Sequence, residues 1–119
     1  MADPKRTLFI FRQPPYKGTL ARDGLEMALA MGALGQPCEI LFLNQGVLQL
    51  RVEEPPVGMK NHSAMLAALP MYDIQNCWVT SEALAAQGLA GAELAVECKS
   101  VAMAKLDEFY ARFDHRISF

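Results

Sequence analysis

The sequence alternates between short, wholly apolar segments and longer stretches in which apolar residues recur at helical spacing. Residues 8–11 and 40–43 are unbroken apolar runs, which is the pattern of strands that are covered on both faces of a sheet. Weaker runs of the same kind follow later in the chain. The pattern predicts five strands, at residues 6–12, 40–43, 76–79, 93–98 and 116–119.

Helical spacing between these runs predicts four helices. The first spans residues 20–34, with Thr19 as its N-cap, and ends where Gly35 and Pro37 stop a helix. The second should begin near Asn61 and end at Pro70, the third should be capped by Ser81 and stop at Gly88, and the last should begin at Ser100. The last helix should pack through Ala102, Leu106, Phe109 and Phe113.

The strict alternation of strands and helices predicts the fold class. A strand followed by a helix and another strand forms a right-handed crossover, so the sheet should be parallel with helices above and below it. We therefore expect an α/β protein, a flavodoxin-like three-layer sandwich whose five-stranded, mostly parallel sheet has helices on both faces. With 119 residues and no linker or repeat, the chain should form one domain over residues 1–119.

Some apolar positions have no obvious place in such a core. Met27 and Met31 give the first helix a second apolar face, and the segment after the second strand carries Val47, Leu48 and Leu50. Hydrophobic residues make up 52% of the chain and charged residues only 20%. We expect the helix face with Met27 and Met31 to contact a neighbouring chain. If the protein is a docking subunit, Val47, Leu48 and Leu50 should contact partners as well, and in an isolated preparation other copies of the chain would cover this surface.

Charge and cysteine content narrow the function classes. A net charge of −2 provides no cationic field for holding nucleic acid, so direct binding of DNA or RNA is not expected. The sequence shows neither a membrane-spanning run nor a secretory segment. We therefore expect a cytoplasmic protein. In such a protein, three cysteines without metal-ligand spacing favour reduced thiols and no metal site.

The loop after the first strand is the first place to look for a phosphate-binding cofactor. Pro14 and Pro15 have no amide proton to offer there, and neither a GxGxxG nor a GxxxxGK[ST] motif occurs. No cofactor is therefore expected, although a small flavin protein stays open as a remote alternative. Gly46, in the polar turn at residues 44–46, is able to take a positive φ. His62 and His115 lack suggestive neighbours and are expected on the surface.

A reactive cysteine needs an exposed thiolate near positive charge. Cys38 and Cys77 lie in apolar surroundings and resemble small buried hydrophobic residues. Cys98 is better placed, at the end of the predicted fourth strand, with Lys99 as the one neighbouring charge that could activate it. Cys98 and Cys77 are thus the candidates for a reactive thiol, and a structural role is favoured for both.

Two segments together resemble a known family. The segment FLNQGVLQL at residues 42–50 and the segment MYDIQNCWVTSEALAAQGL at residues 71–89 are similar to the DsrF-like branch of the DsrE/DsrF/DsrH family. An opening strand, a helix after Gly18 and Thr19, and a short closing strand that ends in Phe119 extend the likeness over the whole chain.

The resemblance implies a role in sulfur relay. Such proteins assemble with TusB-like and TusD-like relatives into a heterohexamer with two copies of each. The complex passes persulfide sulfur from a TusA-like donor to a TusE-like acceptor, for 2-thiouridine at the tRNA wobble position. Similar complexes in sulfur-oxidising bacteria serve dissimilatory sulfur metabolism, and the sequence does not choose between the two pathways.

In these assemblies the chief sulfur-carrying cysteine belongs to the TusD-like subunit, eight residues before the glycine that closes the next helix. Counting back from Gly88, that position is Thr80 in this chain. A threonine hydroxyl cannot carry sulfur as an anion. The resemblance therefore implies a non-catalytic subunit, and the alternative is a cysteine-persulfide sulfurtransferase that acts through Cys98 or Cys77.

Overall fold

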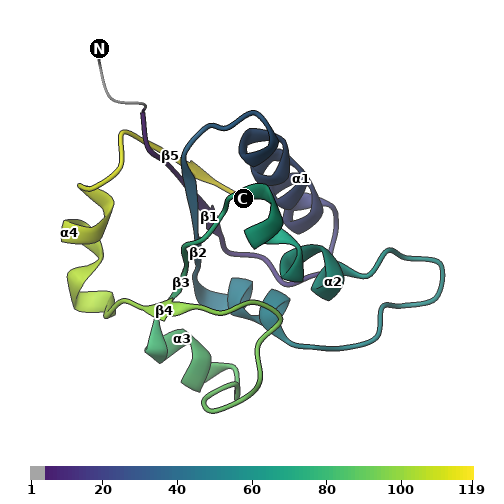
Figure 1. The fold of residues 1–119 in the computed structure, drawn as a ribbon. Helices are drawn as coiled ribbons and strands as arrows, with labels where there is room; N and C mark the ends of the chain where they lie inside the picture. Colours follow the sequence, from purple (N-terminus) through teal and green to yellow (C-terminus); the bar gives the residue numbers. More distant parts are fainter. Residues whose placement is uncertain (1–4) are drawn as a thin grey trace.

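The structure is a computed structural model that describes residues 5–119. Five strands form one sheet in the order β4-β3-β2-β1-β5, and every neighbouring pair is parallel (Figure 1). The strands are β1 (Thr7–Phe11), β2 (Cys38–Phe42), β3 (Cys77–Val79), β4 (Lys99–Ser100) and β5 (His115–Ser118). Four helices connect them: α1 (Leu20–Ala33), α2 (His62–Ala67), α3 (Ser81–Ala86) and α4 (Leu106–Tyr110).

Strand order decides which face of the sheet each helix covers. From β1 to β4 the chain moves steadily in one direction, so right-handed crossovers place α1, α2 and α3 on the same face. The step from β4 back to β5 crosses the sheet the other way and places α4 on the opposite face, as Figure 1 shows. The predicted α/β sandwich with helices on both faces is confirmed.

Alternate side chains of the strands supply two separate apolar cores. Phe9 and Phe11 of β1 point to the core beneath α1 and α2, whereas Leu8 and Ile10 point to the core beneath α4. Both cores contain wholly buried side chains from β1 and β2, which explains why these strands have unbroken apolar sequences. Burial of those side chains is the main force that holds the three layers together.

Both predicted ends of α1 are correct in position. Gly35 has a φ of 74°, and its amide donates to the carbonyl of Gly32 while the amide of Gln36 donates to the carbonyl of Met31. This pair of bonds is a Schellman motif, which favours glycine at that position. Thr19 is the N-cap residue, as predicted, although its side chain makes no capping hydrogen bond.

The segment after β2 differs from the expected turn. Residues Asn44–Leu50 form a 3-10 helix, η1, which lies against the carboxyl end of the sheet. Gly46 does not take a positive φ; Asn44 does, with a φ of 52°. Glycine is required at position 46 because a Cβ there would lie 1.9 Å from the backbone oxygen of Phe11. The close approach of η1 to β1 therefore explains this glycine.

The fourth strand and the last helix are displaced from their predicted positions. Residues 93–98 form no strand: Leu94 makes an isolated antiparallel bridge to Arg51, and the amide of Ala95 donates to the carbonyl of Leu50 at 2.8 Å. The segment is thus held by the end of η1 rather than by β3. Ser100 lies in β4, a short 3-10 helix η3 (Met103–Lys105) follows, and Ala102 is exposed instead of packed.

Pro70 also acts differently from the prediction. The helix α2 ends at Ala67, before the proline, and Pro70 lies in the first turn of a 3-10 helix, η2 (Leu69–Tyr72). Proline suits the first turn of a helix because an amide proton is not needed there. Within residues 5–119, no helix is both long enough and apolar enough to cross a lipid bilayer.

Candidate functional site

Two hollows lie at the carboxyl end of the sheet, where parallel α/β proteins place their sites. The first is a groove of about 510 Å³ beside β3 and α3. Arg12 follows β1, Asn44 follows β2 and Thr80 follows β3, and all three residues line this groove. Met103 and Tyr110 approach from the α4 side.

Thr80 has a structural function at this edge. Its side-chain oxygen accepts a hydrogen bond from the amide of Ala83 at 3.2 Å, so Thr80, and not the predicted Ser81, caps α3. The residue is only 1% exposed. A hydroxyl that is buried and already engaged in capping is not available as a nucleophile.

The three cysteines are poorly placed for sulfur chemistry. Cys77 is the first residue of β3 and is 2% exposed, and burial raises the pKa of its thiol far above the ordinary range. Burial, with the nearby charge of Glu97, raises the pKa of the Cys98 thiol to about 12. Burial and the charge of Glu39 raise that of Cys38 to about 11. At neutral pH all three are therefore neutral thiols rather than nucleophilic thiolates.

Lys99, the charge predicted to activate Cys98, is directed to other residues. Lys99 donates from Nζ to the side-chain oxygen of Asn76 at 2.8 Å and lies over the Trp78 ring. Among residues 5–119, the one charge that acts on the pKa of Cys98 is the carboxylate of Glu97, which disfavours the thiolate. The Sγ atom of Cys98 is 3.4 Å from the carbonyl of Val96, to which it donates.

Two of the five predicted interface residues lie inside the chain. The side chains of Val47 and Leu50 are wholly buried in the core beneath α1 and α2, so the prediction that they contact a partner is wrong for both. The 3-10 geometry of η1 turns them toward β1 and β2. Leu48 and Met31 are partly buried against the same core, and Met27 is exposed. For these three the interface stays a prediction.

The second hollow, of about 330 Å³, lies between the start of α1 and the start of α2. His62 stands at its wall, 4% exposed, and its Nε2 lies 2.8 Å from Oε1 of Gln49. The amide nitrogen of the same Gln49 side chain, Nε2, donates to the carbonyl of Gln13 at 2.8 Å. This second bond fixes the orientation of the amide, so Nε2 of His62 must be the donor in the first.

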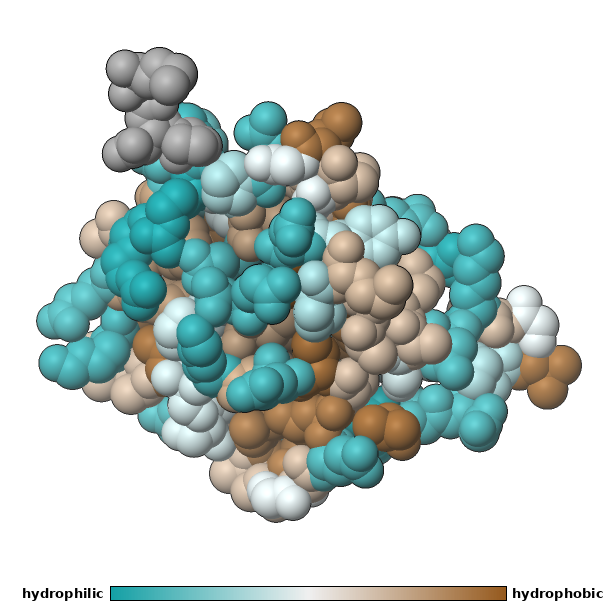
Figure 2. Space-filling view, in the orientation of Figure 1, coloured by the Kyte–Doolittle hydropathy of each residue, from teal (hydrophilic) through white to brown (hydrophobic). Residues whose placement is uncertain are grey.

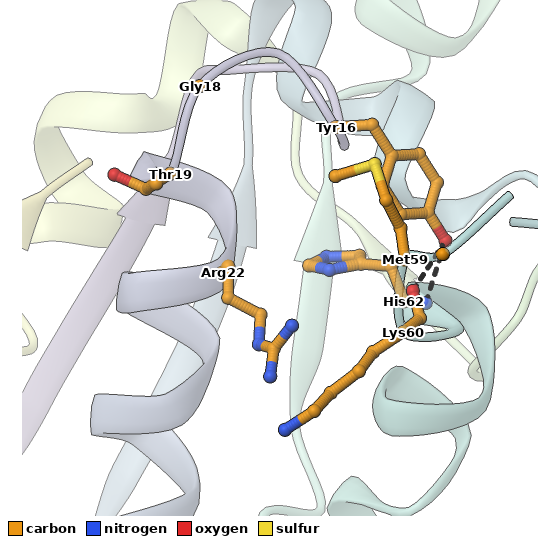
Figure 3. Close-up of a pocket in the computed structure, with 8 residues that line it drawn as sticks. Tyr16, Gly18, Thr19, Arg22, Met59, Lys60 and His62 are labelled. Carbon is orange, nitrogen blue, oxygen red and sulfur yellow. Dashed lines mark hydrogen bonds between the residues drawn. The ribbon is translucent and has the colours of Figure 1, made fainter. Parts of the chain in front are cut away.

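Tyr16 holds the chain before α2 in place. Its hydroxyl accepts from the amide of His62 at 2.9 Å and donates to the carbonyl of Lys60 at 3.2 Å (Figure 3). Arg22 of α1 and Lys60 both extend toward the same side of the pocket, below the imidazole ring. Burial, and then the charge of Arg22, lower the pKa of His62 to about 4, so the ring is neutral at physiological pH.

The sequence did not reveal this pocket, and His62 was wrongly expected on the surface. One signal was present: Gln49 is a polar residue between Leu48 and Leu50 in an apolar segment, and it is 1% exposed. A buried amide needs buried partners. Those partners, Gln13 and His62, lie far away in sequence and could not be identified before the fold was known.

The chain matches the family model described as the DsrE/DsrF-like family over residues 5–119. The chain belongs to the DsrE/DsrF-like family. Two curated relatives are named "Protein TusC homolog". The one from Vibrio parahaemolyticus is 30% identical over 93% of this chain and 96% of its own length, and the one from Pseudomonas aeruginosa is 35% identical over 93% and 95%.

Solved structures confirm the fold of this DsrE/DsrF-like chain. The crystal structure of the Escherichia coli ychN protein superposes with a TM-score of 0.85 at 14% identity, over 97% of this chain and 99% of that one. A conserved Bacteroides thetaiotaomicron protein of unknown function gives a TM-score of 0.63 at 15% identity, over 95% and 94%. At such identities the likeness concerns the fold alone.

The chemistry available to this DsrE/DsrF-like chain is limited. Within residues 5–119, no group of three or more histidine, cysteine, aspartate or glutamate side chains is arranged to hold a metal ion. The carboxyl-edge groove presents a capping hydroxyl instead of a thiol. The pocket beside α1 presents two cations and a neutral imidazole, an arrangement suited to binding rather than to nucleophilic attack.

Proposed function

We propose that this chain is a non-catalytic subunit of a TusBCD-like sulfur-relay complex. The complex would pass persulfide sulfur from a TusA-like donor to a TusE-like acceptor, toward 2-thiouridine at the tRNA wobble position. In this proposal a TusD-like partner supplies the sulfur-carrying cysteine, and this chain shapes and supports the assembly.

The observation that carries the proposal is that a capping threonine occupies position 80 and that all three thiols have raised pKa values. Thr80 lies at the start of α3, where a cysteine would have the positive end of a helix beside it, and its hydroxyl caps that helix. Cys77 and Cys98 have raised pKa values and lie outside the groove. Similarity to two TusC homologues at 30% and 35% identity supports the sulfur-relay context.

Apolar surface supports the partnership. Leu34 is 77% exposed and Met71 is 85% exposed, and Met27 also reaches the surface. Figure 2 shows apolar areas that interrupt the hydrophilic surface on the face drawn there. Exposed apolar side chains of this kind suit burial against TusB-like and TusD-like subunits, and an isolated preparation would bury them between identical copies.

Co-expression tests this proposal. We expect the chain to co-purify with TusB-like and TusD-like partners as a defined hetero-oligomer, and to self-associate when produced alone. Size-exclusion chromatography with light scattering measures both states. A chain that stays monomeric at high concentration and binds neither partner would contradict the proposal.

A matched pair of variants locates the interface. Met27→Ser removes an exposed apolar side chain from α1, and Val57→Ser does the same in the loop before α2. Met27→Ser should weaken the complex, whereas Val57→Ser should leave it intact, because residue 57 is not among the proposed interface positions. An equal effect of the two changes would show that a general loss of surface hydrophobicity, and not a defined interface, is responsible.

A further inference from the structure

The pocket between α1 and α2 gathers positive charge without a matching acid in its wall. Arg22 and Lys60 line it, and Figure 3 shows both side chains extending to the same side of the cavity. Arg22 uses only its Nε atom in its ion pair with Glu26, at 2.7 Å. Within residues 5–119, Lys60 forms no ion pair, and no acidic residue lines the pocket.

His62 adds an acceptor to these two cations. Its Nε2 donates to Gln49, whose orientation is fixed by Gln13, so Nδ1 carries the lone pair of the neutral ring. Among the described residues, every fully buried side-chain nitrogen or oxygen has a hydrogen-bond partner. Within residues 5–119 Nδ1 forms no hydrogen bond, so this atom is not fully buried, and the pocket is the open space that His62 lines.

We propose that this pocket binds a small oxyanion that still carries a proton, of the hydrogenphosphate type. The anionic oxygens would face Arg22 and Lys60, and the remaining hydroxyl would donate to Nδ1 of His62. Because side chains hold the anion, the site needs no glycine-rich loop, and the two prolines at positions 14 and 15 do not obstruct it.

The arrangement also predicts selectivity. Sulfate and thiosulfate bear no proton at neutral pH, so each would present only acceptors to the lone pair of Nδ1. A volume of about 330 Å³ exceeds that of a bare oxyanion, and Met59 and Tyr16 offer apolar surface beside the cations. The phosphate group could therefore be free or belong to a small phosphomonoester. This inference does not rest on the proposed role in sulfur relay.

Calorimetric titration of the full chain tests the proposal. At about pH 5.5 both inorganic phosphate and a phosphomonoester are mostly in a form that still carries a proton, while the His62 ring stays neutral. We expect saturable binding of inorganic phosphate and, at equal ionic strength, about tenfold weaker binding of sulfate. Glycerol phosphate distinguishes the two sources. Tighter binding than that of inorganic phosphate identifies an organic phosphate as the ligand, and weaker binding identifies the free anion.

Variants connect the binding to the named side chains. Arg22→Gln and Lys60→Gln, both at solvent-accessible positions, should each weaken phosphate binding by about tenfold. Arg116→Gln, an exposed change on β5 outside the pocket, should leave binding unchanged. Three results would each overturn the proposal: phosphate binding that does not saturate, sulfate binding as tight as that of phosphate, or a loss of phosphate binding in Arg116→Gln equal to that in Arg22→Gln.

Discussion

His62 should make the stability of the protein depend on pH. Its folded-state pKa is lowered to about 4, first by burial and then by the charge of Arg22, whereas an unfolded histidine has a pKa of about 6.5. The unfolded chain therefore binds a proton that the folded chain excludes. The stabilising contribution is complete above about pH 6.5 and is lost as the pH falls toward about 4.

The size of the effect follows from the difference between the two pKa values. A difference of roughly 2.5 units, at about 1.4 kcal/mol per unit, corresponds to about 3 kcal/mol of unfolding free energy. The charged and titratable groups that face the ring are Arg22 from α1, with Lys60 and Tyr16 from the loops beside it.

Urea denaturation from about pH 7.5 to about pH 4.5 measures this contribution. The wild-type chain should lose about 2.5 kcal/mol more stability over this range than His62→Gln, which keeps an amide donor for Gln49 but cannot titrate. His115→Gln, at an exposed position of β5, controls for the loss of a histidine and should follow the wild-type curve. Parallel curves for wild type and His62→Gln would refute the reasoning.

Two further predictions concern η1 and α3, and urea denaturation measures both. Gly46→Ala should destabilise the fold by about 3 kcal/mol or more, because the new Cβ would meet the backbone of Phe11 at 1.9 Å. Gly18→Ala, with no atom within 4 Å but a φ of 70°, should cost about 1 kcal/mol, and equal losses would contradict the steric argument. Thr80→Ala should cost about 1 kcal/mol through the lost cap, and Ser81→Ala almost nothing. The reverse order would contradict the assignment of Thr80 as the cap.

Apolar periodicity predicted the central part of the fold. The strands β1 and β2 have side chains buried on both faces, so their sequences are continuously apolar and recognisable without any other information. The end of α1 was equally clear, because a glycine with a proline two residues beyond is a local signal.

The errors lie where the structure depends on contacts between distant segments. Residues 93–98 have the composition of a strand, but their backbone is bound to the end of η1, which local sequence cannot reveal. The same limit explains Val47 and Leu50, whose burial depends on how η1 folds over the sheet. At the candidate site, Thr80 was located by family resemblance, whereas the pocket of His62 required the three-dimensional arrangement.

Sulfur labelling of the reconstituted complex tests the central claim, that this chain supports the relay without carrying sulfur. The complex with TusB-like and TusD-like partners is incubated with a persulfide donor, and each subunit is analysed by mass spectrometry. The account predicts a gain of about 32 Da, one sulfur atom, on the TusD-like partner and none on Cys38, Cys77 or Cys98. A stoichiometric gain on Cys77 or Cys98 of this chain would contradict the account.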